Sequence, residues 1–101
     1  MKIGIDAISY YVPNHYLPIE DLANFRNIEY AKLNRGLGLT SMSFPDIDED
    51  APSMGANAVL EMFHRESLNP STVGRLYLGT ESALDSAKPT ATYILDLVER
   101  E

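Results

Sequence analysis

The pattern of apolar and polar positions predicts strands and helices in alternation. Residues 2–12 (KIGIDAISYYV) are rich in β-branched and aromatic side chains and end at Pro13, which cannot extend a strand ladder. Residues 75–80 (RLYLGT) have the pattern of a second buried strand. The apolar residues of the first strand alternate on two faces, with Ile3, Ile5 and Ala7 on one and Ile8, Tyr10 and Val12 on the other. This pattern predicts a strand that is covered on both faces or contains a bulge.

Four segments between and after these strands have helical spacing. They are 18–26, which Pro18 opens; 29–35, which Gly36 and Gly38 end; 50–67, capped by Asp50; and a last helix from Pro89 to Glu101. We expect a short extended segment at 41–44 and a turn at 69–71. A strand, helices and a strand in this order favour a right-handed parallel crossover. The predicted fold class is therefore α/β, a βαβ-type segment with a parallel sheet flanked by helices, whose sheet edges and apolar helix faces lack partners.

Length, composition and charge narrow the classes of function. A chain of 101 residues forms at most one ordinary domain. Its net charge of −7 disfavours nucleic acid and anionic membrane surfaces as partners. No apolar run approaches the ~20 residues that span a bilayer, and Asp6 interrupts any secretory signal, so we expect a soluble, cytoplasmic protein. Without cysteine, the chain has no disulfide, thiolate metal site or thiol nucleophile.

Glu81 is the first candidate for chemistry. It follows a predicted buried strand and a Gly-Thr pair, where open α/β sheets carry residues that face a ligand. A carboxylate at this place has the chemistry of a general base, although a solvated loop glutamate is the simpler interpretation. Asp85 and Lys88 in the same loop are expected to form a local ion pair.

Other polar clusters have simpler structural interpretations. The acidic residues at 46–50 lack the glycine and the glutamate of a calcium loop, which favours an acidic turn before a helix. His15 and His64 have no second ligand at metal-binding spacing, and we expect them to be structural or solvated. Gly36 and Gly38 follow the basic residues Lys32 and Arg35, so this segment has the features of a phosphate site or, more simply, of a helix stop.

Four segments together resemble the start of the 3-hydroxy-3-methylglutaryl-CoA synthase family. They are GIDAISYYVP, EYAKLNRGLG, SMSFPDIDED and RLYLGTESALDSAKPT, and they occur in the order and spacing of that family. The resemblance runs from about Ile3 to the end of the chain, and its most specific part is Gly79-Thr80-Glu81-Ser82. It implies a partial thiolase-like fold in which residues 1–101 form the N-terminal segment of one domain, with the remainder of the domain outside this chain.

The resemblance also implies roles for particular residues. Glu81 matches the family's general base, which removes a proton from the methyl group of an acetylated cysteine so that the carbon can attack acetoacetyl-CoA. Glu29 and Tyr30 match a segment that contacts the coenzyme in the family, and Lys32 is expected near the phosphates of the coenzyme. The nucleophilic cysteine and the catalytic histidine are expected beyond residue 101 or on a partner chain, so this segment alone is expected to be inactive.

The activity implied for the whole enzyme is that of an acyltransferase of the mevalonate and isoprenoid pathway. Its substrates would be acetyl-CoA and acetoacetyl-CoA, with no cofactor and no metal, and it would form a homo-oligomer. One alternative keeps the fold but acts on acyl-carrier-protein thioesters in polyketide β-branching. Another is a non-catalytic subunit that docks on a thiolase-like partner through its apolar faces. The loop sequence Asp85-Ser86-Ala87-Lys88 also departs from many relatives, which have a serine directly before the lysine.

Overall fold

The computed structural model describes residues 1–100 of the chain, which divide into two compact units. The first unit combines residues 1–11 with the residues from Glu49 onward, and the second consists of Val12–Asp48. Among residues 1–100, none of the helices has the length and apolar character needed to cross a bilayer.

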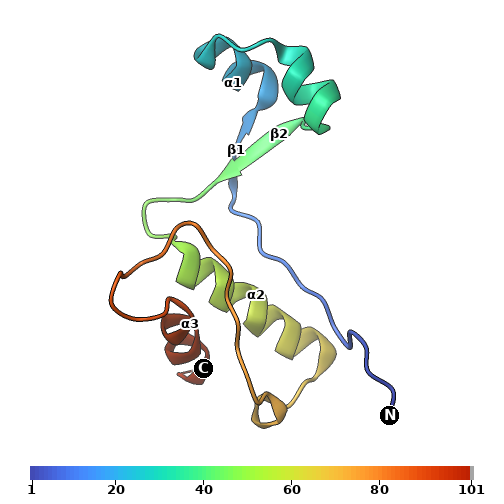
Figure 1. Ribbon diagram of the computed structural model, residues 1–101, viewed down its shortest axis with the longest axis vertical. Coiled ribbons are helices and arrows are strands. Elements are labelled where there is room, and N and C mark those ends of the chain that lie inside the picture. The colour runs from blue at the N-terminus through green and yellow to red at the C-terminus, as the bar shows by residue number, and fades with distance from the viewer. Residues whose placement is uncertain (101) are drawn as a thin grey trace. The chain divides into compact units, whose positions relative to one another are not determined.

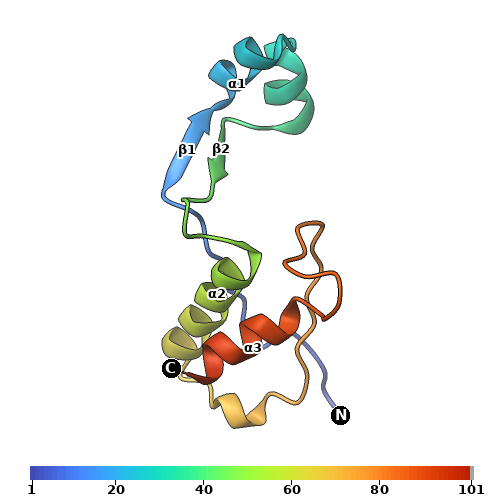
Figure 2. The same cartoon turned by 90° about the vertical axis from the view of Figure 1, so that its left-hand side faces the viewer.

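Two helices packed together form the core of the first unit. They are α2 (Ala51–Glu66) and α3 (Ala91–Glu99), and α3 lies against α2 (Figure 2). Ala56, Phe63 and Ile94 are buried between them. Gly55 allows this close approach, because a Cβ atom there would lie 2.7 Å from Cδ1 of Ile94. The core of this unit is therefore small and depends on one apolar face of each helix.

Caps set the limits of α2. The Asp50 side chain accepts a hydrogen bond from the Ser53 amide at 2.9 Å, and the Ser53 hydroxyl accepts one from the Asp50 amide at 2.8 Å. This reciprocal capping box, with Pro52 in the first turn, confirms the predicted start of the helix. Ser67, in the left-handed conformation at φ 51°, ends it. The predicted turn at 69–71 is a 3₁₀ turn, η2 (Pro70–Thr72), which the Asn69 side chain caps.

The two predicted strands of this unit are not strands in the structure. Residues 2–12 and 75–80 have no ladder partner among residues 1–100, so the parallel crossover expected between them is absent there (Figure 1). The first segment is held by side-chain contacts with α2 instead. Ser9 donates to the Ala58 carbonyl oxygen at 2.5 Å, and Arg65 donates to the Ile8 carbonyl oxygen at 2.5 Å. A strand needs a neighbouring backbone to satisfy its amides, whatever its propensity.

The second unit contains the two-stranded sheet of the described chain. Strands β1 (His15–Pro18) and β2 (Ser41–Phe44) pair antiparallel, with His15 opposite Phe44 (Figure 1). Strand β2 confirms the predicted extended segment, whereas no strand is predicted at 15–18. The His15 and Phe44 rings stack at 5.4 Å between centroids, which adds a cross-strand contact.

Two helical segments lie between these strands in the sequence. Helix α1 (Ile19–Arg26) confirms the helix predicted at 18–26 and buries Ile19 and Ala23. The segment predicted at 29–35 forms a π-helical turn, η1 (Lys32–Gly36), and Gly38 follows with φ +70°. Gly38 therefore provides the positive φ expected of a glycine that ends a helix. The last predicted helix is confirmed as α3, except that Glu101 lies outside the described residues.

Candidate functional site

Glu81 begins an irregular loop that connects the apolar segment 75–80 to α3. Its side chain is exposed, and no regular secondary structure fixes the loop over residues 81–90. The turn at Glu81 is stabilised by Thr80, whose hydroxyl accepts a hydrogen bond from the Ser82 amide at 3.0 Å. The residues on either side of Glu81 are thus linked across it, so its backbone direction is set locally.

Asp85 is the most connected side chain of this loop. One carboxylate oxygen accepts from the Ala87 amide at 2.6 Å, and the other accepts from the Tyr93 hydroxyl at 2.9 Å. These hydrogen bonds, the backbone one foremost, lower the pKa of Asp85 from its ordinary value, and the nearby Lys88 charge adds to the effect. The ionised form of Asp85 is therefore the form that the loop stabilises.

The predicted ion pair between Asp85 and Lys88 is absent from the described structure. The Lys88 ammonium lies instead over the Tyr93 ring, 4.2 Å from its centroid. The two oxygens of Asp85 accept hydrogen bonds from the Ala87 amide and the Tyr93 hydroxyl. Lys88 and Asp85 thus both contact Tyr93, one at the ring face and the other at the hydroxyl.

Thr90 makes a second connection between the loop and α3. It is a buried polar residue, and its hydroxyl oxygen accepts a hydrogen bond from the Leu84 amide at 3.2 Å. The pattern of the sequence does not single out Thr90 or Tyr93. A usable signal is their spacing, because residues three apart at the start of a helix lie on one face, here the face toward the preceding loop.

The other predicted site residues lie in the second unit. Glu29, Tyr30 and Lys32 are close together in the sequence around the start of η1, and all are exposed. The Lys32 amide donates to the Glu29 carbonyl oxygen at 3.0 Å, which closes the turn that presents them. The structure therefore brings these three residues onto one exposed turn, while Glu81 belongs to the other unit.

The acidic segment and His15 have structural contacts. Asp46 contacts His15 at 2.9 Å, and this hydrogen bond is the main cause that lowers the Asp46 pKa. Asp50 caps α2, in agreement with the interpretation of an acidic turn before a helix. Over residues 1–100, no group of three or more carboxylate or histidine side chains has the arrangement of a metal site.

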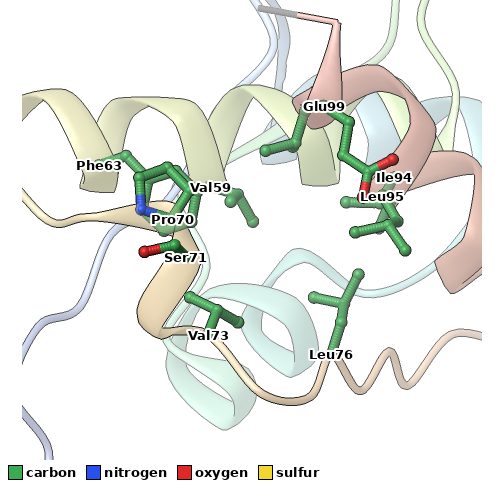
Figure 3. Close-up of a pocket in the computed structure, with 10 residues that line it drawn as sticks. Val59, Phe63, Pro70, Ser71, Val73, Leu76, Ile94, Leu95 and Glu99 are labelled. Atoms are coloured by element: carbon green, nitrogen blue, oxygen red, sulfur yellow. The ribbon is translucent and has the colours of Figure 1, made fainter.

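An apolar pocket of about 320 Å³ lies in the first unit between α2, α3 and the segment 70–76 (Figure 3). Val59 and Phe63 of α2 line it opposite Ile94 and Leu95 of α3, and Glu99 brings a carboxylate to the lining. None of the residues predicted to bind or react lies in it. Its lining is typical of apolar surface that packs against another part of a protein.

Comparison with known proteins places the chain in a family. Residues 1–101 match the model described as hydroxymethylglutaryl-coenzyme A synthase N terminal. The chain therefore belongs to the hydroxymethylglutaryl-CoA synthase family, and it matches the N-terminal segment of that family.

Individual relatives agree with this assignment. The chain is 37% identical to the hydroxymethylglutaryl-CoA synthase of Haloferax volcanii, with 98% of this chain and 22% of the relative aligned. It is 38% identical to hydroxymethylglutaryl-CoA synthase A of Dictyostelium discoideum, over 95% of this chain and 20% of the relative. The chain thus spans about a fifth of the length of the curated relatives it matches.

A solved structure extends the similarity to the fold. The structure of MvaS in complex with 3-hydroxy-3-methylglutaryl coenzyme A matches 98% of this chain and 24% of its own length, with 37% identity and a TM-score of 0.85. This agreement confirms that the chain has the backbone of a hydroxymethylglutaryl-CoA synthase segment, while its described sheet is the small antiparallel one and not the parallel sheet predicted.

Proposed function

We propose that this chain acts as the N-terminal part of a hydroxymethylglutaryl-CoA synthase that condenses acetyl-CoA with acetoacetyl-CoA through an acetyl-cysteine intermediate. The observation that carries the proposal is its similarity, over nearly its full length, to a synthase solved with 3-hydroxy-3-methylglutaryl coenzyme A. This chain contains no cysteine, so the nucleophilic thiol belongs to another part of the enzyme in this proposal. The reaction would require no cofactor or metal.

In the proposed reaction, Glu81 is the general base. Its carboxylate removes a proton from the methyl carbon of the acetyl-cysteine, and the resulting carbanion bonds to the ketone carbon of acetoacetyl-CoA. The C=O π electrons then move to the ketone oxygen, which takes up a proton to become a hydroxyl. In this chain the Glu81 side chain is exposed to solvent. In the complete enzyme, cover from the remaining chain would exclude water from this carboxylate, which suits a base for a weakly acidic proton.

Glu29, Tyr30 and Lys32 are proposed to contact coenzyme A. The exposed turn at the start of η1 supports this role, because it presents a carboxylate, an aromatic ring and an ammonium together. The ammonium would pair with a phosphate, and the aromatic ring would cover apolar parts of the ligand. The similar MvaS structure is a complex with a coenzyme A thioester, which favours a CoA substrate over a carrier-protein thioester.

Two features of the proposal concern the whole enzyme. The apolar segments 2–12 and 75–80 are proposed to join a larger thiolase-like sheet there, which would give their amides ladder partners. The enzyme is proposed to be a cytoplasmic homo-oligomer of the mevalonate pathway.

The alternative of a non-catalytic subunit with the same exposed apolar faces is disfavoured by the Gly-Thr-Glu-Ser sequence. This sequence keeps a carboxylate at the position of the family's base.

The test is Glu81→Gln in the complete synthase that carries this segment. The amide keeps the shape of the side chain but accepts no proton, so condensation should fall by about 10²–10⁴-fold while acetyl-enzyme formation stays close to normal. Glu61→Gln, an exposed glutamate of α2, is the matched control and should leave both steps unchanged. Equal losses in both steps, or unchanged condensation in Glu81→Gln, would contradict the role of Glu81.

A further inference from the structure

The loop that begins with Glu81 is fixed to α3 through a small set of polar contacts. Because the loop has no regular secondary structure, these contacts determine its shape between Leu84 and Thr90. We define this set as the loop brace, and it consists of Asp85, Lys88, Thr90 and Tyr93.

The residues of the loop brace that lie at the start of α3 are held in place by the packing of α3 against α2. Tyr93 and Thr90 lie at the start of α3, next to Ile94, which is buried against Gly55 of α2. A shift of α3 along α2 is opposed by this close contact, since the interior packs densely and responds to sub-ångström changes. The positions of the Tyr93 hydroxyl and the Thr90 hydroxyl therefore follow from the packing of the two helices.

A set of hydrogen bonds connects the start of α3 to the loop residues next to Glu81. The Tyr93 hydroxyl donates to Asp85, and the Asp85 carboxylate also accepts from the Ala87 amide. The Leu84 amide donates to Thr90, only three residues after Glu81. At the other end the Thr80 hydroxyl holds the Ser82 amide. Each hydrogen-bonded pair removes freedom from the short segment that carries the Glu81 side chain.

We infer that Tyr93, Asp85 and Thr90 are positioning residues for Glu81, which they act on through the loop and without contacting substrate. The inference rests on the proposed function, in which Glu81 is the base of the condensation. The Asp85–Tyr93 hydrogen bond has a charged acceptor and is part-buried, so it is a strong contact for this purpose. A base displaced by a fraction of an ångström loses rate, whereas the acetylation of a cysteine on another part of the enzyme does not depend on it.

The experiment uses the complete synthase with Tyr93→Phe, Asp85→Asn and the double variant. Tyr93→Phe keeps the ring under Lys88 and removes only the hydroxyl. Each single variant should lower kcat for condensation by roughly tenfold to a hundredfold, with KM and acetyl-enzyme formation close to normal. Asp85→Asn leaves one acceptor oxygen where the carboxylate uses two, so it weakens the contact that Tyr93→Phe removes, and the double variant should lose little more than the worse single one.

Matched controls come from the same helix. Asp96→Asn changes an exposed carboxylate of α3 that pairs with Arg100, and Thr92→Val changes an exposed threonine whose hydroxyl donates only to the nearby Pro89 carbonyl oxygen. Both should leave condensation unchanged, whereas Thr90→Val should lower kcat. The Leu84 amide should exchange its hydrogen faster in Tyr93→Phe than in the unaltered enzyme, a result that is independent of activity.

Three outcomes would overturn the inference. In the first, single-variant losses multiply in the double variant. In the second, condensation and acetylation fall in parallel with the melting temperature, which shows that the brace only stabilises the fold. In the third, Leu84 exchange is faster but condensation is unchanged, although Glu81→Gln blocks it. If Glu81→Gln itself leaves condensation unchanged, the proposed function fails, and faster Leu84 exchange still shows whether the brace holds the loop.

Discussion

The first unit contains two kinds of apolar segment, the helix pair α2 and α3 and the extended residues 2–11 and 75–80. They differ in how their backbone hydrogen bonds are satisfied. Ile94 of α3 is 3% exposed, whereas Ile3 in the first segment is 84% exposed and Tyr77 in the second is 81% exposed. A helix satisfies its backbone hydrogen bonds internally, so two helices need only each other's side chains to pack. A strand needs a neighbour's amides, and these segments have none among residues 1–100. The segments with the strongest strand composition are therefore the part of this unit whose backbone lacks ladder hydrogen bonds.

The largest expected effect is in hydrogen exchange of the two apolar segments. If they enter a sheet in the complete synthase, their amides should exchange at least ~10³-fold more slowly there than in the 101-residue chain, since core ladders open only with global unfolding. Amides in the middle of α2 should be protected in both. Equal exchange rates of residues 2–12 in the two proteins would contradict the proposed pairing. A hydrophobic dye that binds the chain but not the complete enzyme would support it.

The helix pair should be sensitive to the removal of its central contact. Ile94→Ala should lower the free energy of unfolding by about 2–5 kcal/mol, because it deletes a buried side chain between two helices. The adjacent Leu95 is 47% exposed, so Leu95→Ala should cost clearly less. Urea denaturation of the complete synthase and of the chain would measure both. A similar loss for the two variants would show that Ile94 is not the centre of this core.

A smaller effect is expected at the start of α2. Asp50→Ala removes the side chain that accepts from the Ser53 amide, which should cost about 0.5–2 kcal/mol of unfolding free energy. Asp48→Ala, two residues earlier and outside the capping box, should change it by no more than about 0.5 kcal/mol. If the two variants are equally stable, the capping box contributes nothing to the helix in solution.

The smallest effect is expected in the titration of Asp85. Its hydrogen bonds lower its pKa in the folded chain, so this group contributes stability above its unfolded value near ~3.9, and that contribution disappears as the pH falls through the folded value. Carbon-detected NMR of the carboxyl should find a midpoint below ~3.9, and Tyr93→Phe should raise it. A midpoint that does not respond to Tyr93→Phe would show that the hydroxyl is not bonded to Asp85 in solution.

The sequence predicts the helices better than the sheet. Spacing and caps identify α1, α2 and α3, because these signals are local to each helix. The strand composition of 2–12 carries no information on a partner, and the short β1 is weakly patterned, so pairing is the part that local rules miss.

The candidate site is also predicted only in part from the sequence. The Gly-Thr-Glu-Ser sequence identifies Glu81, and the resemblance adds Glu29, Tyr30 and Lys32, whose roles stay predictions. The contact of Asp85 with Tyr93 depends on how the loop meets α3, which residue spacing alone does not determine.

The second unit, Val12–Asp48, is an insertion within the first, and this has a consequence for how the protein can vary. The two residues at the points of insertion meet, because the Tyr11 hydroxyl donates a hydrogen bond to the Glu49 carboxylate across 38 positions of the chain. The entropy of closing such a loop grows only with the logarithm of its length, about 0.6 kcal/mol for each doubling. Lengthening or shortening the insertion therefore costs little in the folding of the unit that carries Glu81. Under the proposed function, evolution can remodel the coenzyme contacts around Tyr30 almost independently of the residues that hold the base.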